Sequence, residues 1–146
     1  MKIGLCSDHR GFYLKSELVK FLREKGYEVK DFGTDSDESV DFPDFAFKLG
    51  DAIVNGDVAM GIAICGTGIG MSIALNKVRG VVCGKISNAS EAMLCRAHNN
   101  ANCIAMSEDI SYDNAKEMVM KFINTPFSNM PKYVRRNKKI SDRENG

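Results

Sequence analysis

The strongest constraint on the fold is the segment Met60–Cys65, an apolar run without a polar side chain. A strand that lacks polar alternation is covered on both faces, as in parallel sheets that lie between layers of helices. Similar short runs recur along the chain and predict further strands at Lys2–Cys6, Tyr27–Phe32, Val81–Cys83 and Cys103–Met106. The pattern predicts an α/β fold, a three-layer α/β/α, doubly wound (Rossmann-like) arrangement with a mainly five-stranded parallel sheet.

Stretches with apolar residues at helical spacing follow the predicted strands and indicate helices. These helices are expected near residues 12–25, 43–56, 71–77, 90–97 and 112–123. The chain has 146 residues, 44% of them hydrophobic, so we expect a single domain over residues 1–146. Its tail, residues 126–146, is basic and has few core-type residues, and we expect it on the surface or against a partner subunit.

The charge balance argues against several kinds of partner. Twenty Lys and Arg face nineteen Asp and Glu, and a net charge of +1 is too weak to hold nucleic acid nonspecifically. A nucleic-acid contact through the basic tail is the less favoured alternative, since runs of charge usually form a solvated face. No apolar run approaches the roughly 20 residues that cross a bilayer. The N-terminus is polar by Ser7, so we expect no membrane contact and a cytoplasmic location.

The five cysteines are odd in number and include no C-x-x-C pair. This usage predicts reduced thiols, with neither a disulfide framework nor a metal site. Free cysteine is one of the most buried residue types, so most of these thiols are expected in the core. They are Cys6, Cys65, Cys83, Cys95 and Cys103.

Ligands of doubly wound folds bind beyond the carboxyl ends of the strands, so the loops after the strands are the place to search. Asp8 and His9 follow the first predicted strand, and Cys65-Gly66-Thr67-Gly68-Ile69-Gly70 follows the third. Glycines let backbone N–H groups face an anion at a helix N-terminus. The segment lacks the Gly-Lys-Ser/Thr of a P-loop and the final spacing of the dinucleotide fingerprint. An anion cradle and simple helix–strand packing both remain open.

Cys65 is the strongest candidate for catalysis. It ends a buried strand and precedes a predicted helix N-terminus, where the helix dipole and free amides stabilise a thiolate. A thiol with a lowered pKa can act as a general base near neutral pH, whereas the alternative is one more buried cysteine. His9 and His98 are predicted at the same rim, together with Asp8 and Asn99. Each histidine has a structural alternative, and Asp8 can instead cap the following helix.

Five segments carry a resemblance to a known family: M-K-I-G-L-C-S-D-H-R-G-F, G-Y-E-V-K-D-F-G-T, V-D-F-P-D-F-A, I-C-G-T-G-I-G-M-S-I-A-L-N-K-V and R-A-H-N-N-A-N. The chain resembles the ribose-5-phosphate isomerase B family, which also includes the galactose-6-phosphate isomerase subunits. The resemblance implies interconversion of aldose and ketose phosphates through an enediolate, with no metal and no organic cofactor. It also implies a homodimer with shared active sites, or a tetramer.

The resemblance further implies a role for each candidate residue. Cys65 matches the general base, and His98 matches the acid that opens the sugar ring. The enediolate oxygen is expected to meet Thr67 and the backbone amides of Gly66, Gly68, Ile69 and Gly70. The residues expected to contact the sugar or its phosphate are Asp8, His9, Asn99, Lys132 and Arg136.

Four positions depart from the family pattern, among them Val82, which replaces a frequent arginine. Asp109 and Lys132 stand where the family usually places arginines, and Phe42 stands where many members have Tyr. Lysine lacks the bidentate fork of arginine, and Asp109 would repel a phosphate dianion. Three other arginines are candidates for compensation: Arg10, Arg96 and Arg135. We predict conversion of D-ribose 5-phosphate to D-ribulose 5-phosphate. The alternatives are another aldose phosphate, such as a six-carbon one, or a non-catalytic sugar-phosphate-binding module.

Overall fold

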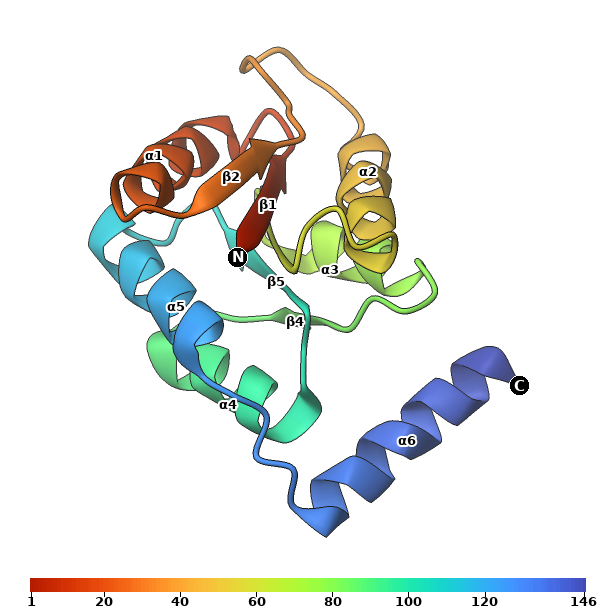
Figure 1. Cartoon of the computed structure of the whole chain (residues 1–146). Helices are drawn as coiled ribbons and strands as arrows, with labels where there is room; N and C mark the ends of the chain where they lie inside the picture. Colours follow the sequence, from red (N-terminus) through yellow and green to blue (C-terminus); the bar gives the residue numbers. More distant parts are fainter.

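The computed structural model describes residues 1–146, in which strands and helices alternate up to Asn124 (Figure 1). The strands are β1 (Lys2–Ser7), β2 (Glu28–Asp31), β3 (Met60–Cys65), β4 (Cys83–Lys85) and β5 (Cys103–Ser107). The helices are α1 (Phe12–Glu24), α2 (Phe42–Val54), α3 (Ile69–Asn76), α4 (Ala89–Asn99), α5 (Tyr112–Asn124) and α6 (Pro131–Asn145). The predicted fold class is confirmed.

The strands form one parallel sheet in the order β2-β1-β3-β5-β4. Ser7 at the end of β1 is paired with Ile64 in β3. Cys65 at the end of β3 is paired with Ser107 at the end of β5. The carboxyl ends of these three strands therefore lie side by side. Helices α1, α4 and α5 cover one face of the sheet, and α2 and α3 cover the other (Figure 1).

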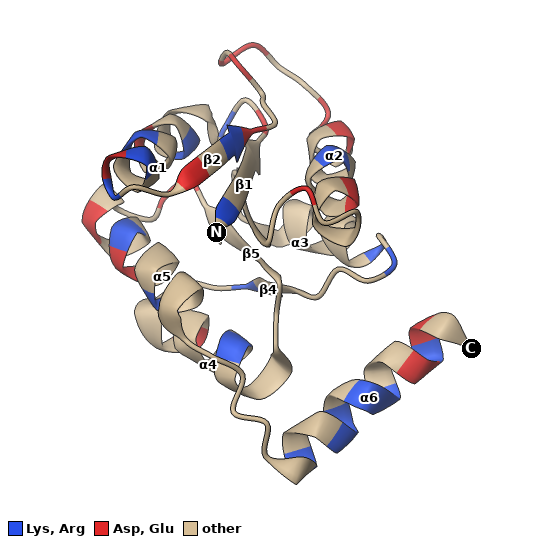
Figure 2. Cartoon of the chain, viewed as in Figure 1, with Lys and Arg blue, Asp and Glu red and all other residues tan.

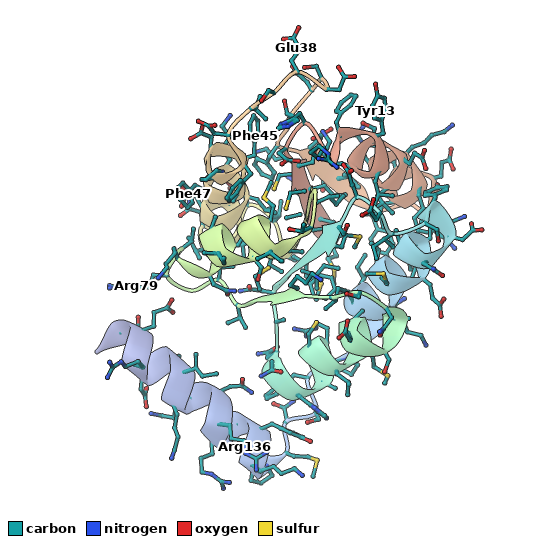
Figure 3. All side chains as sticks on the ribbon, turned by 180° about the vertical axis from the view of Figure 1, so that it is seen from behind. Tyr13, Glu38, Phe45, Phe47, Arg79 and Arg136 are labelled. Atoms are coloured by element: carbon teal, nitrogen blue, oxygen red, sulfur yellow. The ribbon has the colours of Figure 1, made fainter.

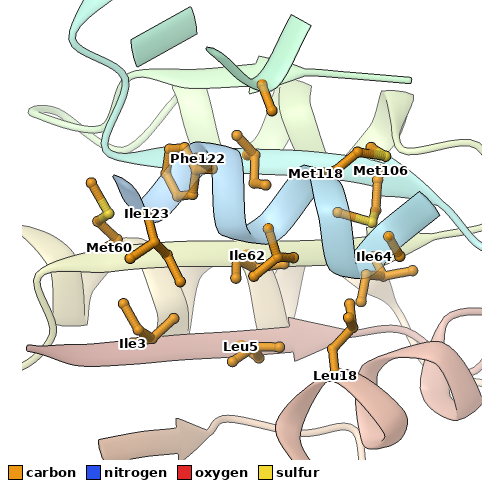
Figure 4. Close-up of a cluster of buried hydrophobic side chains, with 14 of the residues drawn as sticks. Ile3, Leu5, Leu18, Met60, Ile62, Ile64, Met106, Met118, Phe122 and Ile123 are labelled. Carbon is orange, nitrogen blue, oxygen red and sulfur yellow. The ribbon is translucent and has the colours of Figure 1, made fainter. Parts of the chain in front are cut away.

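Two apolar clusters hold the helices on the sheet, and β3 contributes to both. Ile62 and Ile64 enter the cluster beneath α1, α4 and α5, which also contains Phe122 of α5 (Figure 4). Ala63 and Cys65 enter the cluster beneath α2 and α3. Burial of a large aliphatic or aromatic side chain contributes about 1.5–3 kcal/mol to folding. Because both faces of β3 are covered, the strand has no position for a polar residue, as its apolar sequence predicts.

The edge strand β4 begins two residues later than predicted. The apolar pair before Cys83 favours a strand over Val81–Cys83, whereas pairing with β5 runs over Cys83–Lys85. The Asn76 side chain fixes this start, because it accepts the N–H of Cys83 (2.8 Å) and donates to its C=O (2.9 Å). The apolar run predicts burial here, and the ladder hydrogen bonds lie slightly further along the chain.

The basic tail forms a helix, α6, which the sequence pattern did not predict. Pro131 lies in its first turn, a favoured position for proline. None of its residues is buried, and Val134 and Ile140 remain exposed. The helix extends away from the sheet and carries a row of Lys and Arg (Figures 1 and 2). It lacks the buried apolar stripe that identifies a helix in a sequence. No helix of the chain has the length and apolar character needed to span a membrane.

Candidate active site

The predicted loops meet at the carboxyl edge of the sheet, between β1 and β3. After β1 the chain enters α1 on one face, and after β3 it enters α3 on the other. The N–H of Asp8 donates to the C=O of Ile64 (3.3 Å), which joins the two loops at their base. Neighbouring strands whose connections leave to opposite faces open a crevice between their loops, the usual ligand position in doubly wound folds.

The thiol of Cys65 lies at the N-terminus of α3. The residue is only 5% exposed, and its Sγ accepts a hydrogen bond from the N–H of Gly68 (3.2 Å). Its C=O accepts the N–H of Glu108 (2.9 Å), which fixes the backbone beside the thiol. An N–H donor and the positive end of a helix dipole both stabilise a thiolate relative to a thiol. Cys65 is therefore placed where a thiol can act as a base.

The turn after Cys65 presents backbone donors that nothing in the chain accepts. The N–H groups of Gly66, Thr67 and Gly70 have no partner, while that of Ile69 donates to Thr67 Oγ1 (3.1 Å). Helix α3 begins two residues before the predicted start, so Gly70 lies in its first turn. Unpaired N–H groups at a helix N-terminus bind anions. The turn can thus receive an oxyanion beside the thiol.

Two glycines of this turn are also required by packing. Gly68 has a φ of +82°, and a Cβ there would lie 2.9 Å from the backbone of Met106 in β5. A Cβ on Gly70 would lie 2.8 Å from the ring of Phe42. A Cβ on Gly66 would meet nothing closer than 3.9 Å. Packing against β5 therefore explains Gly68 and packing against α2 explains Gly70, whereas Gly66 is free for another purpose.

None of the other cysteines lies at the N-terminus of a helix. Four of the five cysteines are buried, and none of the five forms a disulfide. Burial raises the pKa of the Cys6 and Cys103 thiols, and that of the half-buried Cys95 thiol to about 11. These thiols stay neutral near pH 7 and serve as small apolar side chains. No group of three or more His, Cys, Asp and Glu side chains is arranged to hold a metal ion.

Asp8 and His9 line the β1 side of the crevice. Asp8 Oδ1 accepts the N–H groups of Arg10 (3.0 Å) and Gly11 (3.1 Å), so the residue caps the turn into α1. Its Oδ2 accepts no hydrogen bond within the chain. His9 Nδ1 accepts the N–H of Val40 (3.2 Å), so the neutral imidazole carries its proton on Nε2. A free carboxylate oxygen and a free imidazole N–H thus remain for a ligand.

A buried ion pair fixes the loop 33–41 that faces His9. Lys15 of α1 is only 1% exposed, and its ammonium binds Asp31 Oδ1 (2.8 Å) and the C=O of Thr34. A buried ammonium needs several acceptors, and here they come from the end of β2 and the loop itself. The sequence pattern shows this loop only as polar, and Lys15 falls within a helical stretch, so nothing in the spacing indicates the pair.

His98 and Asn99 do not lie at this edge, and the prediction that places them there is wrong. They end α4 and lead into the amino end of β5, whereas Cys65 is paired with Ser107 at its carboxyl end. The strand steps from Cys103 to Ser107 separate the two ends by about 13 Å. His98 and Asn99 come before β5, whereas the ligand sites of parallel sheets form in the loops that follow strands.

His98 lies instead against α6. Its ring stacks on Tyr133, with the ring centroids 4.3 Å apart and an interplanar angle of 17°. The Asn137 side chain donates to the His98 C=O (2.7 Å), and Asn99 Nδ2 donates to Asn137 Oδ1 (3.3 Å). Neither Tyr133 nor Asn137 can be found from the sequence pattern, because both fall in a tail without the apolar spacing that predicts a helix.

The predicted phosphate ligands Lys132 and Arg136 are also on α6. Both are exposed, and Lys132 Nζ lies 5.0 Å from the centre of the Tyr133 ring. Arg136 stands at the opposite end of the molecule from Glu38, in loop 33–41 (Figure 3). Within one chain the predicted residues therefore form two groups. Asp8, His9 and residues 65–70 lie at the carboxyl edge, and His98, Asn99, Lys132 and Arg136 lie at the α4–α6 end.

Of the three arginines considered for compensation, one lies at the crevice. Arg96 is engaged elsewhere, since it donates to the C=O groups of Thr125 (3.1 Å) and Ala101 (2.7 Å). Arg135 is an exposed residue of α6. Arg10 follows the Asp8-His9 loop and forms an ion pair with Glu108, a residue that the sequence analysis did not consider.

The fold brings a thiol next to backbone N–H groups that have no partner, in an α/β protein, and this is the kind of arrangement that can move a proton beside a developing oxyanion. A family model described as Ribose/Galactose Isomerase matches residues 3–140. The chain belongs to this family, as the sequence motifs predict.

Relatives of known name agree with this assignment. Ribose-5-phosphate isomerase B of Escherichia coli (strain K12) is 41% identical over 127 residues, which cover 86% of this chain and 85% of that protein. The solved structure of Clostridium thermocellum ribose-5-phosphate isomerase B is similar at a TM-score of 0.96 and 43% identity, over 99% of this chain and 98% of that one. A Mycoplasma genitalium ribose-5-phosphate isomerase B with bound ribulose-5-phosphate has a TM-score of 0.92 and 35% identity, over 99% and 96% of the two chains.

Proposed function

We propose that this protein interconverts D-ribose 5-phosphate and D-ribulose 5-phosphate, with Cys65 as the general base. The observation that carries the proposal is the Cys65 thiol at the N-terminus of α3, beside backbone N–H groups without a partner. The relatives are named as isomerases of this substrate. The free cysteines suit a reducing compartment, and we assign the reaction to the cytoplasm.

The reaction moves one proton between neighbouring carbons. The Cys65 thiolate removes the proton from C2 of the open-chain aldose, and the electron pair forms an enediolate whose negative charge resides on O1. The amides of Gly66 and Gly70 donate to this oxygen, and preorganised donors of this kind lower the barrier because they need not reorient. The C2 hydroxyl proton then passes to O1, and the Cys65 thiol returns its proton to C1, which gives the ketose.

We also propose that the complete site needs two copies of the chain. His98, the residue expected to open the sugar ring, lies with Arg136 at the end of the molecule remote from Cys65. Helix α6 buries none of its residues within its own chain and carries exposed apolar residues. A twofold dimer places the α4–α6 end of one copy over the carboxyl edge of the other, and generates two equivalent sites. Pairing of dimers into a tetramer is compatible with this geometry.

The test of the reaction is an isomerase assay on purified protein. We expect turnover of D-ribose 5-phosphate, and a loss of about 10²- to 10⁴-fold in kcat for Cys65→Ala. Cys95→Ala removes a half-buried thiol of α4 and serves as the matched control, with turnover unchanged. Allose 6-phosphate and galactose 6-phosphate test the six-carbon alternative. Full activity of Cys65→Ala would remove the thiol from the mechanism, and ligand-induced stabilisation without turnover would favour a binding module.

Complementation between variants tests the shared site. Cys65→Ala and His98→Ala are each expected to be nearly inactive alone. When the two are unfolded together and refolded as a mixture, half of the dimers contain one copy of each, and one of their two sites is intact. The mixture should recover about a quarter of the wild-type activity. Mixtures that stay inactive, although both variants dimerise, would show that each site is built from one chain.

A further inference from the structure

An ion pair that has no role in the mechanism above joins the loops that follow β1 and β5. Arg10 Nε donates to both oxygens of the Glu108 carboxylate (3.1 Å each), and Arg10 Nη2 donates to Oε1 (2.5 Å). Arg10 belongs to the loop after β1 and Glu108 to the loop after β5. Because β3 lies between these strands, the pair crosses the turn that follows Cys65.

The Arg10 side chain lies directly against the turn that holds the free amides. A Cβ placed on Gly66 would meet only Arg10, with Cγ at 3.9 Å and Cζ, the guanidinium carbon, at 4.0 Å. The guanidinium therefore lies next to Gly66, the residue whose N–H has no partner in the chain. On the other side, the N–H of Glu108 binds the C=O of Cys65 (2.9 Å). Gly66 is the glycine of the turn that packing does not explain, and the Arg10 side chain lies over it at van der Waals distance.

In the protein without substrate, the Glu108 carboxylate is bound to the Arg10 guanidinium. Its hydrogen bonds raise the pKa of Arg10 above the usual value, and the charges of Asp109 and Asp8 add to this effect. The Arg10 side chain is 61% exposed, and an ion pair that water can reach contributes little to stability. Arg10 can therefore exchange one anion for another at a small cost in free energy.

We propose that Arg10 binds the phosphate group of the substrate, and that Glu108 is a built-in competitor which the phosphate displaces. The inference rests on the proposed isomerase function and names the residue that recognises the anionic end of its substrate. A sugar phosphate is mostly a dianion at pH 7 and offers oxygens that match the guanidinium fork. An unphosphorylated aldose cannot displace Glu108, so the pair also selects phosphorylated substrates.

The test is that substitutions of Arg10 and of Glu108 should change the affinity for the substrate in opposite directions. Arg10→Gln should raise the KM for D-ribose 5-phosphate, and the inhibition constant of inorganic phosphate, about tenfold, since it removes a charge-assisted contact. Glu108→Gln should lower both constants about threefold, because the competitor has lost its charge. The kcat of both variants should stay within about twofold of wild type, since neither residue touches the reacting carbons. Arg10→Lys keeps the charge without the fork and should fall between Arg10→Gln and wild type.

A purely structural ion pair predicts a different pattern. Both single variants would then change KM in the same direction, and the double variant would be no worse than either one. Under the proposal, Arg10→Gln/Glu108→Gln resembles Arg10→Gln alone. The control is the pair Lys2–Glu28 (3.4 Å) at the amino ends of β1 and β2, where Lys2→Gln and Glu28→Gln should leave both constants unchanged.

The inference and the proposed function can fail separately. Absence of turnover in the wild-type protein would reject the isomerase, and a shift in thermal unfolding with inorganic phosphate would still report on Arg10. Normal turnover with an unchanged KM in Arg10→Gln, or with a raised KM in Glu108→Gln, would reject the role of the pair and leave the isomerase intact.

Discussion

The two ends of the sheet hold their functional residues in different ways. At the carboxyl edge, Cys65 and Asp8 are buried, and backbone hydrogen bonds fix the loops that carry them. At the other end, His98 is held by a stacked tyrosine and one amide contact, and α6 has no buried residue. The Cys65 thiol and the amides of the following turn are thus positioned by folding of the chain itself. His98 ends α4 and stacks on Tyr133, whereas Lys132 and Arg136 lie on α6 itself, a helix that packing within the chain barely supports.

Deletion of residues 131–146 should separate folding from catalysis and give the largest effect. The buried core ends at Ile123, so the shortened chain should still unfold cooperatively. It loses Arg136 and the ring that orients His98, and we expect kcat/KM to fall about 10³-fold or more. Thermal unfolding by circular dichroism and the isomerase assay measure the two properties. Retained activity would contradict the division between the two ends, as would loss of the cooperative transition.

A methyl group added to the turn after Cys65 should reduce activity more than a methyl group added to another glycine with a positive φ. Gly68→Ala combines a positive φ with a Cβ 2.9 Å from Met106, and we expect about a 10²-fold loss of kcat and about 3 kcal/mol less stability. Gly26→Ala is the matched control, because its φ is +94° and its Cβ would meet nothing within 4 Å. It should cost about 1 kcal/mol, with normal kcat. Equal losses of activity in the two variants would show that the turn does not position the site.

Two ion pairs of similar length sharpen the comparison in terms of stability. Lys15–Asp31 (2.8 Å) has its lysine 1% exposed, whereas both partners of Lys138–Asp142 (2.7 Å) on α6 are more than half exposed. Lys15→Met leaves a partly buried carboxylate without its cation and should lower the free energy of unfolding by about 3 kcal/mol. Lys138→Met should lower it by less than about 0.5 kcal/mol. Urea unfolding measures both changes. A similar loss of unfolding free energy in the two variants would contradict the view that the carboxyl edge is held more firmly than α6.

The smallest expected effect concerns alkaline pH. The Cys95 thiol has its pKa raised to about 11 by burial, above its ordinary value of 9.0. Ionisation is therefore easier in the unfolded chain, so this contribution to stability is complete below pH 9 and is lost as the pH rises toward 11. Urea unfolding under reducing conditions should show a decline from pH 8 to pH 10. Cys95→Ala should make this decline slightly less steep, and an unchanged slope would mean that the other thiols account for it.

How far the sequence predicts the molecule depends on what holds each element. Strands that helices cover on both faces, such as Met60–Cys65, are predicted closely, because every buried position is apolar in the sequence. Helix α6 was missed because it buries nothing in its own chain. The Cys65 turn was predicted because glycine requirements are local. His98 was assigned to the wrong edge, and the Arg10–Glu108 pair was missed, because both depend on which strand ends become neighbours.

Helix α6 has a practical consequence for mutational screens. Its side chains add little to the free energy of folding of the chain that carries them. Random substitutions between residues 132 and 145 should therefore pass any selection for expression yield or heat resistance. Only a selection for growth on, or turnover of, the sugar phosphate would reveal which of these positions matter.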